Sequence, residues 1–313
     1  MAKAGRVVRK TLADGSVREY RYPAHRPRSP RFGAETIGAL ILAYKASPEW
    51  SALSDASRAT YSTYLKVLEA APHTVVAEVK RRDVLALRDA VAKARGNGAA
   101  TGFLRAASAM FGWAVDREWI EASPVQRIKP LPAGHLPAWT AQDVRVALAF
   151  LPAPLARAVF LAAATGQRRG DLLKLTWEAY DGAALRFRQQ KTGAPMILPL
   201  PAPARAALDA WKLEGRETIL TDKNGKPWVP AYFSADMRRE LDRIEGLPPG
   251  LNIHGVRKFK AADLASAGAT LHQIAAVTGH RTLAMVGLYT ASADQERLAG
   301  EALRGKKPAK YNR

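Results

Sequence analysis

The stretch AVTGHRTLAMVGLYT, residues 276–290, places a tyrosine, Tyr289, nine positions after the pair Gly279 and His280. A tyrosine phenol has a pKa near ~10 and is a poor nucleophile unless its surroundings activate it. Taken alone, the stretch therefore allows two interpretations. Either Tyr289 packs a helix, or it performs chemistry for which other parts of the chain supply the activating groups.

The composition indicates what kind of partner the chain has. It has 313 residues, with 48 Lys and Arg against 28 Asp and Glu and a formal net charge of +20 at pH 7. Such a charge produces a positive field that suits a polyanion, so nucleic acid is the favoured partner. We find no membrane-surface helix, signal peptide or long apolar run, so we expect a cytoplasmic protein with no membrane partner. The absence of cysteine excludes disulfides, thiolate zinc sites and a Cys nucleophile.

Composition and periodicity predict a mainly α fold with a small β-sheet. The last helix of the first helical region should bury one stripe, namely Phe103, Leu104, Ala107, Met110, Phe111 and Ala114. We expect five segments: a basic N-terminal arm and linker over 1–33 with a hairpin within 7–22, a helical domain of about four helices over 34–128, a proline-rich linker over 129–139, a second domain over 140–292, and a basic tail over 293–313.

The second domain should consist of helices around one hairpin. The hairpin is expected within residues 185–200, with a turn at 191–193. The helices are expected near 141–151, 155–165, from about 170, and then near 203–212, 230–245, 255–267, 271–278 and 282–289.

Four separated places in this domain carry groups suited to holding a phosphate. Each group has a structural explanation when taken singly, such as a surface ion pair, a turn lysine, a helix cap or a core aromatic. Together they are the groups that phosphoryl transfer without a metal needs. The places are ATGQRRGDL with Arg168 and Asp171, QQKTGAP with Lys191, NIHGVRKF with His254 and Arg257 on one helix face, and TGHRTLAMVGLY with His280 and Tyr289.

The chemistry of such a set follows from the charge that develops on the phosphate. Two guanidiniums can clamp the non-bridging oxygens of a phosphodiester in fixed geometry, which is electrostatic stabilisation of the kind that Mg²⁺ gives elsewhere. A base and the field of the arginines can activate a phenol, while a lysine can protonate the departing sugar oxygen. No G-x-x-x-x-G-K-[ST] loop or acidic metal cluster is found, so we expect no cofactor and no metal.

In these motifs the chain resembles the tyrosine recombinase family, the phage-type integrases. The T-G-x-R-x-x-[ED]-L box stands at 165–172 and the H-x-x-R box at 254–257, and a G-H pair precedes a tyrosine by the family's spacing. The resemblance extends from about Ala141 to Ala291. It implies a helical core-binding (SAM-like) domain at 34–128 and an α+β DNA breaking-rejoining catalytic domain at 140–292.

The resemblance also implies a role for each matched residue. Gln167, Gly170, Gly255 and Thr278 depart from the commoner Leu, Ser, Asp and Leu, and Arg169 leaves open which arginine of the pair faces the phosphate. The implied roles are Tyr289 as nucleophile, Arg168 and Arg257 as phosphate clamp, Lys191 as general acid, His254 as general base, His280 as a hydrogen-bond partner of the phosphate, and Asp171 as a residue that orients the clamp.

The function implied is site-specific recombination at double-stranded DNA attachment sites through a 3′-phosphotyrosine, for a phage or mobile element. A homo-tetramer on DNA would act, with a DNA-bending factor or excisionase as a further partner. Backbone contacts are expected from Arg58, Lys80, Arg81 and Arg82. The alternatives are a type IB topoisomerase or telomere resolvase with the same chemistry, and a DNA-binding protein without catalysis. Another nucleophile, Tyr311 or Tyr180, also stays open.

Overall fold

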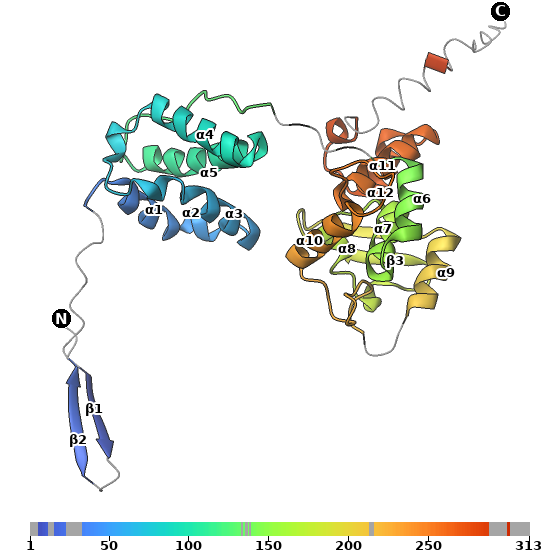
Figure 1. The fold of residues 1–313 in the computed structure, drawn as a ribbon, viewed down its shortest axis with the longest axis horizontal. Coiled ribbons are helices and arrows are strands. Elements are labelled where there is room, and N and C mark those ends of the chain that lie inside the picture. The colour runs from blue at the N-terminus through green and yellow to red at the C-terminus, as the bar shows by residue number, and fades with distance from the viewer. Residues whose placement is uncertain are drawn as a thin grey trace, which may run out of the picture. The chain divides into compact units, whose positions relative to one another are not determined.

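A computed structural model describes residues 6–11, 16–22, 33–132, 134, 137, 139–212, 216–287 and 299–300. The chain divides into two compact units, Met1–Gly134 and His135–Arg313 (Figure 1). The division falls within the proline-rich stretch 129–139. None of the helices in the described ranges has the length and apolar character needed to span a bilayer.

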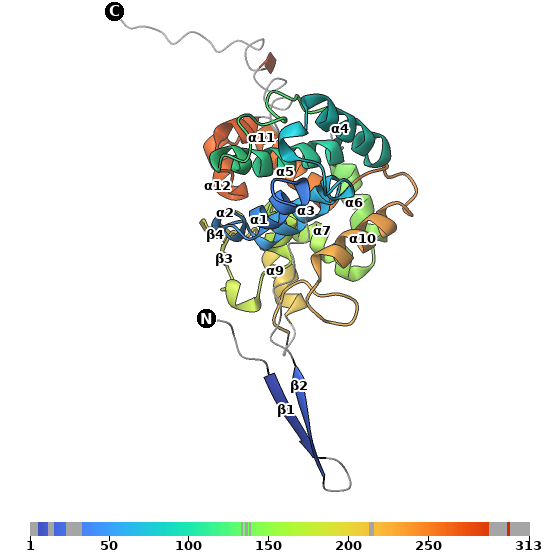
Figure 2. The ribbon, with the colours of Figure 1, turned by 90° about the vertical axis from the view of Figure 1, so that its left-hand side faces the viewer.

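A β-hairpin precedes the helices of the first unit, as the sequence predicted. Strand β1 (Arg6–Thr11) runs antiparallel to β2 (Val17–Tyr22), with Arg6 opposite Tyr22 and Thr11 opposite Val17 (Figure 2). Across the pair, the Arg9 Nε donates to Glu19 Oε2 at 3.1 Å. The hairpin is therefore held by backbone pairing and by one ion pair across the strands.

The rest of the first unit is helical. Its longest helix, α5, contacts α1, α3 and α4. The side chain of Ser54 caps α3 by accepting from the Ser57 N–H. Helix α3 ends at Leu65 and is followed by a short 3₁₀ turn. The helices are α1 (Ile37–Lys45), α2 (Pro48–Ser51), α3 (Asp55–Leu65), α4 (Arg81–Arg95) and α5 (Asn97–Asp116), with 3₁₀ turns at Leu68–Ala70 and Val76–Glu78.

The core of this unit forms around α5. All six residues of the expected stripe are buried, with exposed fractions of 5% or less. Burial of an apolar side chain of the size of Phe103 or Met110 contributes about 1.5–3 kcal/mol. The helical period therefore placed the core correctly.

The second unit combines helices with one small sheet. Strands β3 (Ala184–Arg188) and β4 (Pro195–Pro199) form an antiparallel pair with Ala184 opposite Pro199. The mainly α fold with a small sheet is confirmed. The helices are α6 (Ala141–Phe150), α7 (Ala153–Thr165), α8 (Arg169–Leu172), α9 (Ala202–Trp211), α10 (Pro230–Leu241), α11 (Ile253–Ser266) and α12 (Leu271–Thr278), with a 3₁₀ turn at Trp177–Ala179.

One helix in this unit is short, and one ends earlier than expected. The helix expected from residue 170 has only four residues, and α10 ends at Leu241 rather than 245. Residues 283–287 are helical, and residues 288–289 of the helix expected over 282–289 lie outside the described residues. Helix α11 contacts both α7 and α12. This packing brings together chain segments that carry the sequence motifs.

Candidate active site

Arg168 lies in the turn between α7 and α8. Helix α7 ends at Thr165, and its C-cap residue Gly166 redirects the chain with a left-handed φ of 64°. Arg168 is extended as the N-cap residue of α8. Its guanidinium donates from Nη1 to Gln189 Oε1 at 2.8 Å and from Nη2 to the Gly279 carbonyl at 3.3 Å. One end of this side chain is thereby held by two segments that are distant in sequence.

Arg257 lies in the first turns of α11 and is 1% exposed. Its Nη1 donates to the Gly166 carbonyl at 2.9 Å and to the Thr278 carbonyl at 2.5 Å. A buried guanidinium is stable only when charge-assisted hydrogen bonds replace its hydration. The contacts therefore fix Arg257 between the end of α7 and the end of α12.

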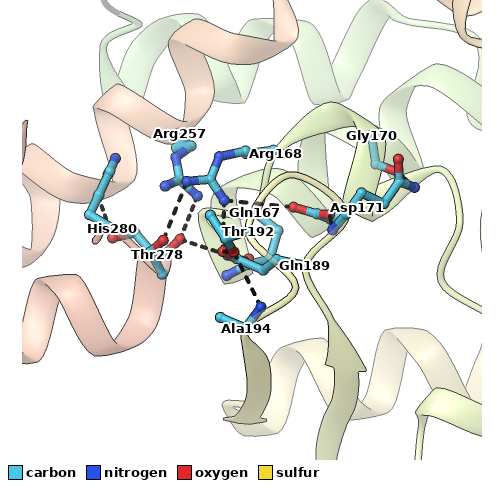
Figure 3. Close-up of polar contacts among 12 residues, drawn as sticks. Gln167, Arg168, Gly170, Asp171, Gln189, Thr192, Ala194, Arg257, Thr278 and His280 are labelled. Carbon is cyan, nitrogen blue, oxygen red and sulfur yellow. Dashed lines mark hydrogen bonds and ion pairs between the residues drawn. The ribbon is translucent and has the colours of Figure 1, made fainter. Parts of the chain in front are cut away.

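The two guanidiniums meet at the end of α12. Arg257 bonds the carbonyl of Thr278 and Arg168 bonds the carbonyl of the next residue, Gly279. Figure 3 shows the two side chains next to each other, above the segment that leads to His280. The two arginines of the expected clamp therefore lie together and create a concentration of positive charge suited to a phosphate.

His280 follows the C-cap of α12 and is 9% exposed. Its Nδ1 lies 2.7 Å from the Thr278 hydroxyl, which also lies 2.6 Å from the Ile274 carbonyl. Because a hydroxyl has only one proton and a carbonyl can only accept, Thr278 donates to Ile274 and accepts from Nδ1–H. Burial, followed by the charges of Arg257 and Arg168, lowers the pKa of His280 to about 4, so the ring is neutral at pH 7 with Nε2 as an acceptor.

His254 is the second imidazole of the site and lies at the start of α11. The Asn252 side chain caps this helix by accepting from the His254 N–H at 3.0 Å. Partial removal from water lowers the pKa of His254, and the charges of Arg257, Lys258, Arg168 and Lys191 lower it further. A neutral imidazole at pH 7 is able to accept a proton.

The depressed pKa of His280 predicts how stability depends on pH. In the unfolded chain an imidazole titrates near 6.5, whereas in the folded chain His280 titrates near 4. Between these values the unfolded state binds more protons than the folded state. The neutral His280 ring therefore makes its full contribution to the free energy of unfolding above pH 6.5, and this contribution falls toward pH 4 by up to about 3 kcal/mol. Urea unfolding of His280→Asn from pH 7 to 4 should show a smaller fall than the wild type.

The matched control for this measurement is His272→Asn, since His272 is an exposed histidine on α12. This variant should keep the wild-type pH dependence. His254 adds a fall of the same sign, so some dependence should remain in His280→Asn. An identical pH dependence in wild type and His280→Asn would contradict the pKa argument.

Lys191 lies in the turn between β3 and β4 and is exposed. The buried carboxylate of Asp171 holds this hairpin: Oδ1 accepts from the Gln190 N–H at 2.8 Å, while Oδ2 lies 3.9 Å from Arg168 Nη1. Asp171 therefore joins α8 to the lysine-bearing hairpin, and its contact with the arginine is the longer of the two. The expectation that Asp171 orients the clamp stays a prediction.

Two buried amides were missed by the sequence interpretation. Gln167 and Gln189 are each 1% exposed, and Gln189 Nε2 donates to Gln167 Oε1 at 3.1 Å. A signal was present for Gln189, because it continues the inward-facing alternation of Leu185 and Phe187 and is polar at such a position. Gln167 was noted only as a departure from the family's leucine.

Glycine is required at position 279 both by the backbone conformation and by the neighbouring side chain of Gln189. Its φ is 69°, and a Cβ there would lie 2.1 Å from Gln189 Nε2. We expect Gly279→Ala to lower the free energy of unfolding by about 3 kcal/mol or more, since strain adds to a clash with a buried side chain. Gly268→Ala is the control, because φ there is 87° with open space around the Cβ, and about 1–2 kcal/mol is expected. Equal losses of thermal stability in calorimetry would exclude the clash.

Gly255, another departure from the family pattern, has a packing explanation. A Cβ at this position would lie 2.6 Å from Trp139 Cδ1. The Trp139 indole is 3% exposed and donates to the Asn252 carbonyl at 2.9 Å. The space for a larger residue in the H-x-x-R box is therefore occupied by this indole.

Arg169 points away from the guanidinium pair. It donates to the Ser234 hydroxyl of α10, whereas Arg168 points toward Arg257. Both arginines line one open cavity of about 920 Å³ together with His254, so it is the direction of their hydrogen bonds that separates them. The geometry thus distinguishes two adjacent arginines that the sequence left undecided.

The four basic residues expected to contact DNA lie on α3 and at the start of α4, where Lys80 is the N-cap residue. Arg58 pairs with Asp55 and Arg82 lies 3.8 Å from Asp83. The Lys80 N–H donates to Asp83 at 2.9 Å. Arg81 donates to the carbonyls of Gln126 and Arg127 at 2.6 and 3.0 Å, so it holds the chain that leaves the unit. Their contacts with DNA stay a prediction.

The expected nucleophile, Tyr289, lies outside the described residues, as does the alternative Tyr311. The other alternative, Tyr180, is 8% exposed, and its hydroxyl lies 3.0 Å from Asp209 Oδ1 and 3.1 Å from the Gly182 carbonyl, so its one proton is donated within this group of acceptors. Burial and then Asp209 raise the pKa of Tyr180. Neither partner belongs to the arginine cluster, so the geometry does not favour Tyr180 as nucleophile.

Comparisons with known proteins match the second unit of the chain to one family. Residues 141–296 match the model of the "Phage integrase family". Among characterised relatives, the tyrosine recombinase XerC of Mycobacterium tuberculosis is 30% identical over 234 residues, which cover 65% of this chain and 77% of the relative.

Solved structures with a similar fold were also found. A lambda integrase dimer bound to a COC′ core site matches with a TM-score of 0.70 and 20% identity, covering 80% of this chain and 97% of that one. A lambda integrase tetramer bound to a Holliday junction matches with a TM-score of 0.68 and 18% identity, covering 88% and 95%. At these identities the two matches establish the fold.

Proposed function

This chain belongs to the tyrosine recombinase (phage integrase) family of DNA breaking-rejoining enzymes, and we propose that it integrates and excises a phage or other mobile element. The general activity is site-specific DNA recombination. The observation that carries the proposal for the active site is the convergence of Arg168 and Arg257 on the carbonyls of consecutive residues, immediately before His280.

We assign the clamp to Arg168 and Arg257, which would hold the non-bridging oxygens of the scissile phosphate. Tyr289 attacks the phosphorus, the bond to the 5′ oxygen of the next nucleotide breaks, and a 3′-phosphotyrosine forms. Lys191 on the β3–β4 turn gives a proton to the departing oxygen. Rejoining reverses these steps, because the phosphotyrosine retains the energy of the original phosphodiester.

The two histidines divide the remaining proton chemistry. His254 is neutral at pH 7 and exposed, which suits a base that accepts the phenol proton. His280 presents Nε2 as an acceptor while it is neutral, so it donates to a phosphate oxygen only after gaining a second proton. The negative charge of bound DNA offsets the field of the two arginines and favours that proton.

Support for the mobile-element role comes from the N-terminal part of the chain and from the relatives. The basic segment 1–33 contains a hairpin that suits a DNA-binding arm, followed by the helical unit that we propose as the core-binding domain. We further propose that the active form is a homo-tetramer on two DNA sites, in view of the lambda integrase tetramer, with the segment 293–313 docking on a neighbour. Arg58, Lys80, Arg81 and Arg82 are proposed to contact DNA, with a bending factor or excisionase as accessory partner.

A second candidate is a chromosomal recombinase of the XerC type, which the 30% identity to XerC favours. The DNA that flanks the gene distinguishes the two. A mobile element has the gene close to one of two short direct repeats that bound the inserted DNA, and the protein should recombine those repeats. Recombination of a site away from the gene, with no flanking repeats, would support the chromosomal role.

The activity itself can be tested without knowing the target. A pool of duplexes with a randomised core and a nick in one strand is incubated with the full chain, and DNA that stays bound after protein denaturation is sequenced. We expect the recovered DNA to share one core sequence, and the 3′ end of its cleaved strand to be joined to the protein. Recovery of no covalent adduct from the pool or from the flanking repeats would exclude recombination by this chain.

A further inference from the structure

Gln189 lies at the centre of a buried amide network. It follows β3, is 1% exposed, and makes four side-chain hydrogen bonds. Its Oε1 accepts from Arg168 Nη1 at 2.8 Å and from the Thr192 hydroxyl at 3.0 Å; its Nε2 donates to Gln167 Oε1 at 3.1 Å and to the Thr278 carbonyl at 3.3 Å (Figure 3). One amide therefore connects the α7–α8 turn, the β3–β4 hairpin and the end of α12.

The orientation of this amide is determined by its partners. A guanidinium only donates and a backbone carbonyl only accepts, so the oxygen of Gln189 must face Arg168 and its nitrogen must face Thr278. Gln167 supports it from the other side, because its own Nε2 donates to the carbonyls of Thr165 at 3.0 Å and Val277 at 2.7 Å. Neither amide can rotate without losing hydrogen bonds in a buried place.

The consequence for Arg168 is a guanidinium fixed before any phosphate binds. One of its terminal nitrogens is held by Gln189 and the other by the Gly279 carbonyl. Preorganised donors stabilise developing charge without reorganisation during the reaction, and small misplacements are costly. Thr192 is also held by Gln189 and lies next to Lys191, so the same amide links the arginine to the turn that carries the lysine.

We propose that Gln189, supported by Gln167, is a positioning residue that sets the Arg168 guanidinium for the scissile phosphate and couples it to the hairpin bearing Lys191. This inference rests on the proposed function. It assigns a catalytic consequence to two side chains that would otherwise only join secondary-structure elements.

The test is a double-mutant cycle between Gln189→Met and Arg168→Lys. Methionine conserves the volume of glutamine and removes only the amide. Single-turnover cleavage of a nicked duplex recovered from the randomised pool should be about 10²-fold slower in Gln189→Met, with an unchanged Kd for that duplex. In the Arg168→Lys background the same change should slow cleavage less than about 3-fold, since residues that act through one another are not additive.

A merely structural role gives a different result, because Gln189→Met would then slow cleavage equally in both backgrounds. That outcome, or wild-type cleavage by Gln189→Met, overturns the inference. Gln190→Met is the matched control, since it makes the same change at an exposed residue of the same hairpin, and it should cleave within about 3-fold of wild type.

Gln167→Met keeps the test decisive if Gln189→Met does not fold. It leaves the bond between Gln189 and Arg168 in place but removes its support, so we expect about 10-fold slower cleavage with Arg168 and no further loss with Arg168→Lys. Equal losses in both backgrounds would again overturn the inference. Cleavage by the wild type distinguishes failure of the proposed function from failure of the positioning role. If the wild type forms no adduct, the proposed function fails. If the wild type is active and the glutamine variants cleave at its rate, only the positioning role is refuted.

Discussion

Tyr289→Phe should abolish the covalent protein–DNA adduct while leaving DNA binding intact. The substitution removes only the phenolic oxygen, which is the proposed attacking atom. Loss of a nucleophile typically lowers the rate by about 10⁴-fold or more. Binding depends instead on many contacts between basic groups and phosphates, so the Kd for a duplex site should change less than about 2-fold. Adduct formation is measured by denaturing gel electrophoresis of a nicked, labelled duplex.

Two further tyrosine variants complete this experiment. Tyr180→Phe removes a hydroxyl that is buried against Asp209, and Tyr311→Phe removes the remaining alternative nucleophile. Both should form the adduct at nearly the wild-type rate. An adduct that persists in Tyr289→Phe and disappears in one of the other two would move the nucleophile to that residue.

Arg168→Lys should slow cleavage by about 10²–10³-fold, the usual loss when one donor to a developing oxyanion is removed. Lysine retains the positive charge but presents a single ammonium, which cannot reach Gln189, the Gly279 carbonyl and a phosphate oxygen at the same time. DNA affinity should change little because the net charge is unchanged. Rates are measured in single turnover on the nicked duplex.

The adjacent residue provides the control for this prediction. Arg169→Lys makes the same change one position along the chain, where the guanidinium contacts Ser234. We expect cleavage within about 3-fold of the wild type, in line with substitutions at exposed surface positions. If Arg169→Lys were the slow variant and Arg168→Lys nearly normal, the assignment of the clamp would be reversed.

Local features of the fold were predictable because they depend on neighbours in the sequence. The apolar stripe from Phe103 to Ala114 repeats with the helical period and is buried as expected. Both hairpins were visible from alternation and turn residues. A helix was predicted from about residue 170 without an end, and the structure shows that it stops at Leu172, in a short turn whose Asp171 binds the neighbouring hairpin.

The identity of the candidate site residues also came from the sequence, through the residue types and spacings of four motifs. What these motifs could not provide was geometry. Arg168 and Arg169 have almost the same local surroundings in sequence, and only tertiary hydrogen bonds separate them, since Arg168 donates to the Gly279 carbonyl and Arg169 to Ser234 of α10. The replacement of the family's aspartate by Gly255 likewise became intelligible only when Trp139 was found in the adjoining space.

The sequence by itself thus determined the class of chemistry, because the charged and nucleophilic groups it requires are a matter of composition and order. Tertiary structure decided which of these groups act together and how they are held. Gln167 and Gln189 illustrate the difference: the motifs assign neither of them a role, yet each carries hydrogen bonds between segments far apart in the chain. Such bonds form only when α7, α12 and the β3–β4 hairpin pack, since burial is what makes a satisfied amide necessary.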